Sequence, residues 1–129
     1  MEKKLKEAEI LINNKEFKKA KELLVSMDKE YPDAYEIKKN LGFCCVNLNL
    51  NNEAKAYFDK TVELNKEDAT SWYYLGILNE NLNLLDEAET AYLKVIELRE
   101  TFSNAYKNLS ILYMKKKDLN KLVEFATIR

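Results

Sequence analysis

The chain repeats itself with a period of 34 residues. The period divides it into four copies, the last of them incomplete: residues 1–34, 35–68, 69–102 and 103–129. One alignment column contains only small residues: Ala8, Gly42, Gly76 and Ser110. A column twelve residues later is nearly as uniform: Ala20, Ala54, Ala88 and Leu122. Because small residues allow two helix backbones to approach closely, each copy is predicted to be one tight helix pair.

The composition favours helices throughout. Two glycines and one proline among 129 residues are too few for a protein built on β-turns and hairpins. Apolar residues recur at helical steps of three and four, as at Leu84, Ala88 and Tyr92. We therefore predict an all-α chain of eight helices: 2–14, 17–30, 34–48, 51–64, 69–82, 85–98, 103–116 and 119–128. A single long coiled coil is excluded, because the apolar pattern is interrupted roughly every 17 residues.

The interruptions within copies are rich in Asn and Lys. The corresponding stretches are Asn13-Asn14-Lys15, Asn47-Leu48-Asn49, Asn81-Leu82-Asn83 and Lys115-Lys116-Lys117. Since Asn tolerates the left-handed conformation that ends a helix, these stretches predict short turns between antiparallel helices. The stretches between copies are predicted to stop one helix and cap the next: Tyr31-Pro32-Asp33, Lys66-Glu67-Asp68 and Thr101-Phe102-Ser103.

The third copy contains Trp72-x-x-Leu75-Gly76-x-x-Asn79, followed by Ala88-x-x-x-Tyr92, and the first copy ends near Pro32. This pattern resembles the tetratricopeptide repeat, and the resemblance covers the whole chain as one domain, 1–129, of about 3.8 repeats. It implies a right-handed α-solenoid of antiparallel helix pairs. It also implies a non-catalytic scaffold for protein interaction, which binds a peptide or protein segment in its concave groove.

The first helix of each pair lines the groove in this family. Positions 2, 5, 6, 9, 12 and 13 of each copy point away from the predicted core columns. The predicted groove residues combine apolar side chains with amide and charged ones: Lys39, Asn40, Phe43, Tyr73, Tyr74, Ile77, Glu80, Lys107, Asn108 and Ile111. This composition is typical of a pocket for one or two apolar anchors of an extended or helical segment. We expect alanine at both Tyr73 and Tyr74 to leave the helix content intact and to weaken binding of the partner.

Some members of this family bind the C-terminal carboxylate of heat-shock chaperones with a clamp of two lysines, two asparagines and one arginine. If the clamp begins in the first copy, its places fall on Leu5, Glu9, Asn40, Thr70 and Tyr74. If it begins in the second, they fall on Lys39, Phe43, Tyr74, Asn104 and Asn108. Each alignment keeps one residue of the five, so a chaperone-tail clamp is not expected.

The sequence gives little support for metal binding, catalysis, or binding of nucleic acid or membranes. The chain has no histidine, and its two cysteines, Cys44 and Cys45, are adjacent, so we expect neither a metal site nor a cofactor, and no enzyme activity. We expect both cysteines to be buried structural residues, and the lysines at 115–117 to form a solvated helix end. The net charge of −1 favours neither nucleic acid nor a membrane as partner. No signal peptide or membrane span is recognised, which predicts a cytoplasmic protein.

The last predicted helix carries an apolar stripe: Leu119, Leu122, Val123, Phe125 and Ile128. No polar helix follows to cover it. Three explanations are open: the chain is the regulatory segment of a longer protein, the stripe forms a homodimer interface, or the helix packs on its own array. Self-association through this stripe is therefore the alternative function.

Overall fold

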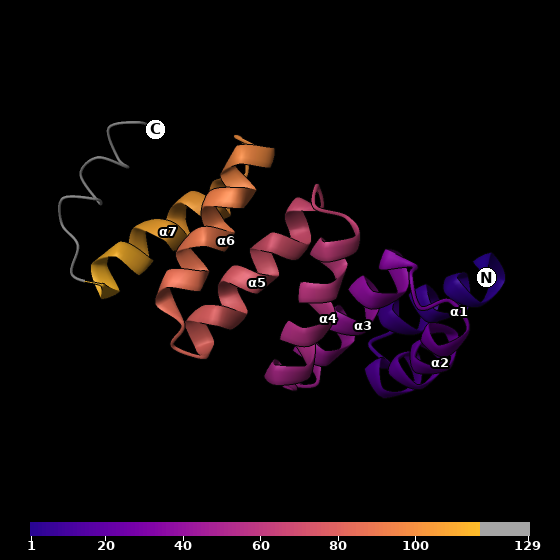
Figure 1. Cartoon of the computed structure of the whole chain (residues 1–129). Coiled ribbons are helices and arrows are strands. Elements are labelled where there is room, and N and C mark those ends of the chain that lie inside the picture. Colours follow the sequence, from indigo (N-terminus) through magenta and orange to yellow (C-terminus); the bar gives the residue numbers. More distant parts are fainter. Residues whose placement is uncertain (117–129) are drawn as a thin grey trace. The chain divides into compact units, whose positions relative to one another are not determined.

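The computed structural model describes residues 1–116, which form seven α-helices and no β-strand (Figure 1). The helices are α1 (Glu2–Asn13), α2 (Phe17–Glu30), α3 (Tyr35–Asn47), α4 (Asn51–Leu64), α5 (Ala69–Asn81), α6 (Leu85–Leu98) and α7 (Ser103–Lys115). The predicted all-α class is confirmed, and the first seven predicted helices agree with the structure to within one residue at each end. The eighth predicted helix, 119–128, lies outside the described residues.

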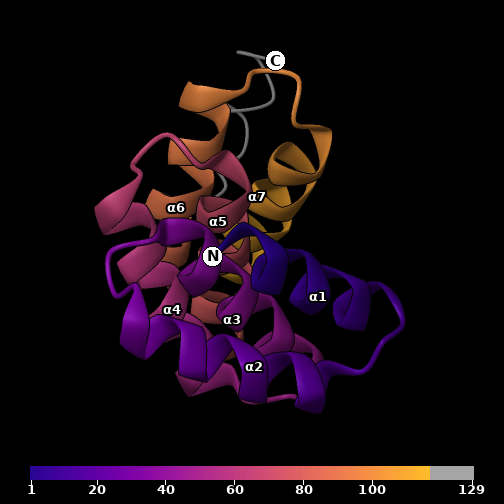
Figure 2. The same cartoon turned by 90° about the vertical axis from the view of Figure 1, so that its right-hand side faces the viewer.

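Two compact units make up the chain. Unit 1 comprises Met1–Ser71, and unit 2 begins at Trp72. Within unit 1, α1 packs on α2, α2 on α3, and α3 on both α4 and α1. Figure 2 shows α1 and α2 as an antiparallel pair. Within unit 2, α6 packs on α7. That the four copies act as one domain stays a prediction.

Each unit has its own apolar core. In unit 1, buried side chains of α1, α2 and α3 gather in one cluster: Ala8, Ala20, Leu24, Met27, Ile37, Leu41 and Cys44. In unit 2, the corresponding cluster joins α6 and α7: Ala88, Tyr92, Leu109, Leu112 and Tyr113. The recurring spacing of three and four residues places these side chains on one face of each helix, as the apolar pattern predicts.

The small-residue column makes room for the second helix of each pair. A Cβ atom on Gly42 would lie 2.8 Å from the buried ring of Phe58, and one on Gly76 would lie 2.5 Å from the buried ring of Tyr92. The glycines therefore accommodate an aromatic side chain, where the sequence suggested contact between backbones. In the first copy the corresponding pair is Ala8 and Leu24, both fully buried in the core of unit 1.

Three of the four predicted left-handed turns are confirmed, and the fourth, at 115–117, extends beyond the described residues. Lys15, Asn49 and Asn83, which are 34 residues apart, have φ angles of 62°, 61° and 61°. After each of them, a backbone N–H reaches back five residues to a helix carbonyl, as from Leu50 to Cys45 at 2.8 Å. This bond satisfies a carbonyl that the helix end leaves without an internal partner. The same turn thus joins the two helices of each of the first three pairs.

The predicted caps between copies are confirmed at one boundary. Asp68 caps α5, because its Oδ1 accepts the Ser71 N–H at 3.1 Å. The expectation was wrong at the other two boundaries, where Ala34 and Phe102 occupy the N-cap positions without a side-chain hydrogen bond. The polar residues there, Asp33 and Ser103, lie one residue away from the position at which a side chain reaches the free N–H groups.

Within residues 1–116, every helix is too short or too polar to span a membrane.

Candidate functional site

Unit 1 contains an open pocket of about 440 Å³ between α1 and α3. Its lining includes three of the predicted groove residues, Lys39, Asn40 and Phe43. The other lining residues are Leu5, Glu9, Ile12, Asn13, Tyr35 and Glu36. The structure therefore brings together, from two successive copies, side chains at the positions that point away from the core.

The floor of this pocket is apolar. Leu5, Ile12 and Phe43 are half-buried, so each leaves part of its side chain accessible. The Phe43 ring meets the Phe17 ring edge-on, with centroids 6.3 Å apart and planes at 63°. This contact fixes one side of the Phe43 ring, which favours a rigid surface for an incoming apolar side chain.

Charges at the pocket's rim are unevenly paired. The Lys39 ammonium lies 3.0 Å from Asp68, whose side chain is only 7% exposed. The Asp68 carboxylate also caps α5, so it has two partners. By contrast, the exposed carboxylates of Glu9 and Glu36 have no cationic partner among residues 1–116.

Unit 2 contains a second open pocket, of about 340 Å³. Four predicted groove residues line it: Ile77, Glu80, Asn108 and Ile111. Asn81, Tyr92 and Lys115 complete its lining. These residues come from α5, α6 and α7, and all except Tyr92 lie on the first helix of a pair.

Glu80 is the electrostatic centre of this second pocket. Its Oε1 accepts a hydrogen bond from the Tyr92 hydroxyl at 2.8 Å, and its Oε2 accepts one from Lys115 Nζ at 2.8 Å. Burial, and then the bond to Glu80, raise the pKa of Tyr92 far above its usual range, so this hydroxyl stays protonated. The carboxylate is thus satisfied within the unit, and its charge is balanced.

Tyr73 is half-buried and has contacts within unit 2, and its predicted role in binding stays a prediction. Its hydroxyl accepts a hydrogen bond from Asn108 Nδ2 at 3.0 Å, and its ring lies 4.9 Å from that of Phe102. The ring also packs against the core of unit 2 and lies 6.1 Å from the Tyr92 ring. Alanine at Tyr73 would leave a cavity and an unpaired amide, so this change should also lower the stability of unit 2.

Two other predicted groove residues of unit 2 lie apart from this pocket. Tyr74 is half-buried against Tyr73, with ring centroids 6.2 Å apart, and burial raises the pKa of its hydroxyl. Lys107 is exposed on α7 and is not among the residues that line the pocket.

Sequence reasoning missed Tyr35 and Tyr92 as pocket residues. Tyr35 is the first residue of its copy, and Tyr92 belongs to a predicted core column, so the helical spacing pointed elsewhere. A signal was present for Tyr92, since a buried tyrosine needs a partner for its hydroxyl. The spacing alone did not identify that partner as Glu80.

Of the three lysines predicted to form a solvated helix end, Lys115 is exposed, Lys116 is largely covered, and Lys117 lies outside the described residues. Lys115 pairs with Glu80 of α5, and Lys116 lies 2.7 Å from carboxylate oxygens of both Asp86 and Glu89 on α6. Only 18% of the Lys116 side chain is exposed. The expectation failed for Lys116 because the acidic first turn of α6 faces the end of α7.

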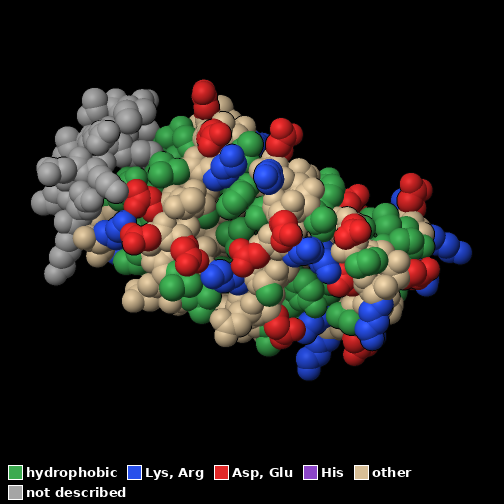
Figure 3. Space-filling view, viewed as in Figure 1, with side chains coloured by type: hydrophobic (Ala, Val, Ile, Leu, Met, Phe, Trp, Pro, Cys, Tyr) green, Lys and Arg blue, Asp and Glu red, His purple; other side chains and the backbone are tan. Residues whose placement is uncertain are grey.

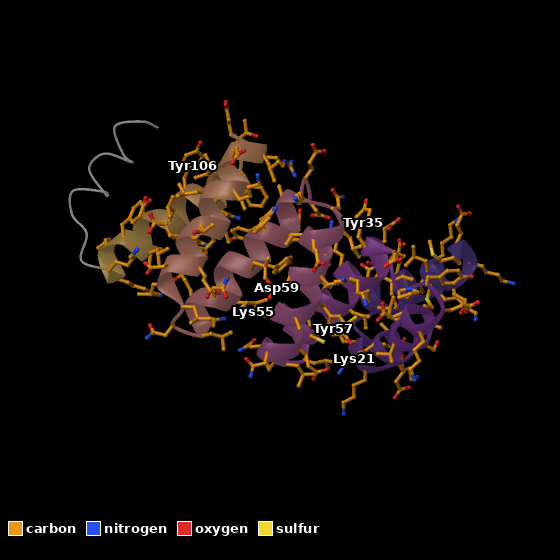
Figure 4. All side chains as sticks on the ribbon, viewed as in Figure 1. Lys21, Tyr35, Lys55, Tyr57, Asp59 and Tyr106 are labelled. Atoms are coloured by element: carbon orange, nitrogen blue, oxygen red, sulfur yellow. The ribbon has the colours of Figure 1, made fainter. Side chains whose placement is uncertain are left out.

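Both cysteines are fully buried, as expected, and neither is in a disulfide. Burial, with a smaller effect from Cys45, raises the pKa of the Cys44 thiol from 9.0 to about 11. Near Cys45 lie Tyr57 and Lys21, which Figure 4 labels, and Lys21 donates a hydrogen bond to Glu53 at 3.0 Å. Burial also raises the pKa of the Cys45 thiol, so neither cysteine supplies a thiolate near neutral pH.

An additional open pocket of unit 1, of about 540 Å³, lies between α2 and the turn from α3 to α4. Lys18, Lys21, Glu22, Val25, Leu48 and Leu50 line it. Residues 1–116 contain no group of three side chains suited to holding a metal ion. The predicted interface residues Leu119, Leu122, Val123, Phe125 and Ile128 lie outside the described residues.

Comparison with known proteins gives a consistent result. A family model described as tetratricopeptide repeat matches residues 11–76, and a second model of the same description matches residues 69–102. No curated protein matches the chain.

Solved structures share the fold at low sequence identity. A crystal structure of MamA superposes with a TM-score of 0.91 at 22% identity, covering 96% of this chain and 72% of that chain. MamA from Desulfovibrio magneticus RS-1 has a TM-score of 0.88 at 18% identity, covering 98% of this chain and 71% of that chain. The first TPR of Spaghetti (RPAP3), bound to the HSP90 peptide SRMEEVD, has a TM-score of 0.84 at 16% identity. The match covers 89% of this chain and 91% of that chain.

Proposed function

Because this chain belongs to the tetratricopeptide-repeat family of helical scaffolds for protein interaction, we propose that it binds a segment of a partner protein along the first helices of its pairs. Binding on this surface involves no catalysis and no cofactor. Neither Cys44 nor Cys45 supplies a reactive thiolate near neutral pH, and binding requires no such group.

One observation carries the proposal: the same repeat positions line a pocket in each unit. Position 9 contributes Phe43 in unit 1 and both Ile77 and Ile111 in unit 2. Position 6 contributes Asn40 and Asn108. A surface that recurs with the repeat is suited to an extended segment that passes successive copies.

The chemistry of these positions suits such a segment. Apolar side chains at position 9 offer contact area to an anchor residue, which supplies most of the affinity in interfaces of this kind. The amide of Asn40 can both donate and accept hydrogen bonds, as the backbone of an extended segment requires. Half-buried surroundings strengthen these bonds by excluding water.

A chaperone-type carboxylate clamp has no support in this chain. The RPAP3 domain holds an HSP90 peptide, but here Lys39 is paired with the buried Asp68 and position 9 of the first copy is the acidic Glu9. A terminal carboxylate would meet repulsion from Glu9 and would compete with Asp68 for the one lysine. We therefore propose an internal segment as the ligand.

The test is a selection of random peptides on the full chain, followed by affinity measurements on variants. We expect Asn40→Ala and Ile111→Ser to weaken the selected peptides by about fivefold or more, because both side chains line the pockets. Asn52→Ala and Leu93→Ser are the matched controls, since Asn52 is exposed on α4 and Leu93 is 42% exposed, as Ile111 is. Peptides that bind all four variants like the parent chain would refute the proposal.

A further inference from the structure

Two carboxylates without partners flank the apolar floor of the unit 1 pocket. Glu9 on α1 and Glu36 on α3 are both exposed. Each has a lysine three residues away on its own helix: Lys39 follows Glu36, and Lys6 precedes Glu9. Neither pairing is formed within the described part of the chain, although this spacing suits a helical ion pair.

The structure shows why Lys39 leaves Glu36 unpaired. Its ammonium turns to Asp68, at 3.0 Å, and the Asp68 side chain is 7% exposed. Withdrawing Lys39 would leave a nearly buried carboxylate without its cation, which is strongly unfavourable. Lys6, in turn, is exposed on α1 and is not among the residues that line the pocket. The accessible charge of this pocket is therefore negative.

The unit 2 pocket lacks this excess of negative charge. Its carboxylate, Glu80, already holds Lys115 and the Tyr92 hydroxyl. The face shown in Figure 3 has no dominant sign either, because acidic and basic side chains are interspersed on it, and the net charge of the chain is −1. A preference for charge must therefore arise locally, at the unit 1 pocket.

We infer that the unit 1 pocket selects a partner segment in which an apolar residue is flanked by lysine or arginine. This inference rests on the proposed function and names the partner's chemistry. The apolar residue contacts Leu5, Ile12 and Phe43, while the flanking cations meet Glu9 and Glu36. Complementary charge sets the specificity, and the anchor supplies most of the affinity.

The test uses three labelled peptides with blocked ends and full-length protein. All three carry the same leucine-phenylalanine anchor with two flanking residues on each side. The flanking residues are lysines in the first peptide, glutamines in the second and glutamates in the third. Binding is followed by fluorescence anisotropy. We expect the lysine peptide to bind about tenfold more tightly than the glutamine peptide, and the glutamate peptide to bind most weakly.

Matched variants assign the preference to the pocket. Glu9→Gln with Glu36→Gln keeps the size of both side chains, and should weaken the lysine peptide by about fivefold while leaving the glutamine peptide unchanged. Glu7→Gln with Glu30→Gln changes the net charge equally at two exposed glutamates of unit 1 outside the pocket, and should change neither. Equal effects of the two double variants would overturn the inference.

Failure of the inference is distinguishable from failure of the proposed function. If all three peptides bind alike and Asn40→Ala weakens each of them, the groove binds segments without charge selection, and the inference alone is wrong. If Asn40→Ala leaves the lysine peptide's affinity unchanged, peptide binding at this pocket is itself refuted. If a higher protein concentration releases the lysine peptide from the pocket, a second copy of the chain competes for the same site. That result would identify the second copy as the occupant and would also overturn the inference.

Discussion

At the contact between the two helices of a pair, the small residue is matched to the side chain sixteen residues later. Gly42 faces the ring of Phe58, and Gly76 faces the ring of Tyr92. In the first copy the second side chain is the smaller Leu24, and alanine takes the place of glycine at Ala8. Because cores are packed to near-crystal density, each increase in one side chain requires a decrease in the other.

Gly42→Ala should therefore destabilise the protein by about 1–3 kcal/mol, since the new methyl group collides with a buried ring. Adding Phe58→Leu recreates the Ala8–Leu24 pair of the first copy. We expect the double variant to be clearly more stable than the sum of the two single changes predicts. Urea unfolding of the four proteins measures this coupling, and strictly additive free energies would refute the size matching.

Burial of Cys44 makes stability depend on pH in the alkaline range. The thiol of the unfolded chain loses its proton near 9.0, whereas burial raises the pKa of the folded thiol to about 11. Between these values the folded state binds more protons, so the stability provided by the thiol is complete below pH 9.0 and is lost as the pH rises towards 11.

The expected loss from this group is about 1.4 kcal/mol for each pH unit in that window. Cys44→Ala removes the titrating group, so the difference between the unfolding free energies of the two proteins should narrow from about pH 9 to about pH 11. Urea unfolding in the presence of a reductant measures both proteins. A difference that stays constant with pH would contradict this account of the thiol.

At the scale of elements, one turn geometry recurs after α1, α3 and α5. The left-handed position is Lys15 in the first turn and asparagine in the other two, Asn49 and Asn83. Lysine is the less suited residue, because it lacks the short polar side chain with which asparagine can form local hydrogen bonds that offset the Cβ clash of this conformation. The first turn therefore carries strain that the other two reduce.

Lys15→Gly should stabilise the protein by about 0.5–1 kcal/mol, the relief of strain exceeding the entropy that glycine adds to the unfolded chain. Lys18→Gly is the control, because Lys18 lies within α2, where glycine should cost about 1 kcal/mol. Thermal and urea unfolding measure both variants. Destabilisation by Lys15→Gly would show that the lysine side chain has a stabilising contact at this turn.

The end of α7 is tied to the start of α6 by Lys116, whose ammonium lies 2.7 Å from both Asp86 and Glu89. Hydrogen bonds to Asp86 and then Glu89 raise the pKa of Lys116, so its contribution is fully present below the ordinary lysine pKa and is lost only above it. The negative first turn of α6 and the positive last turn of α7 also complement the helix dipoles.

Lys116→Gln should lower the free energy of unfolding by about 1 kcal/mol at low salt and by less at high salt, where the ion pairs are screened. Lys94→Gln provides the control, because Lys94 pairs with a single carboxylate, the 70%-exposed Glu97, at 3.5 Å. Its effect should be close to zero at any salt concentration. Equal losses of unfolding free energy in the two variants would show that Lys116 contributes no more than an ordinary surface ion pair.

At the scale of the whole molecule, two functions compete for the same chain. The proposed function uses pockets on the first helices, whereas the alternative uses the apolar stripe at 119–128 for self-association. The two differ in what they require of the protein alone. Peptide binding to the pockets needs one copy, and self-association needs two.

Light scattering over a concentration series separates the two functions. If the pockets are the main binding surface, we expect one constant mass, and peptide binding that Leu122→Ser leaves unchanged. A mass that doubles with concentration, and returns to that of the single chain in Leu122→Ser, would make self-association the leading function. Leu93→Ser again serves as a control for the loss of an apolar side chain on a different helix.

The sequence by itself determined the class of fold and the limits of its helices. A repeat every 34 residues, apolar steps of three and four, and Asn- or Lys-rich interruptions are local features, and each has a direct backbone consequence. The left-handed turns at Asn49 and Asn83 and the burial of Cys44 followed from them. Most of the pocket-lining positions on the first helices followed as well, because helical geometry fixes which residues share a face.

Only the tertiary structure decided which charges pair and which polar groups pack inside. Lys39 with Asp68, Lys115 with Glu80, and Tyr73 with Asn108 are each separated by 29 to 35 residues in sequence. Long side chains reach several partners, so their pairing depends on where neighbouring helices place the opposite charge or the hydrogen-bond partner. These pairings neutralise Lys39 and Lys115, hold Tyr73 against the core of unit 2, and leave Glu9 and Glu36 as the accessible charges of the unit 1 pocket.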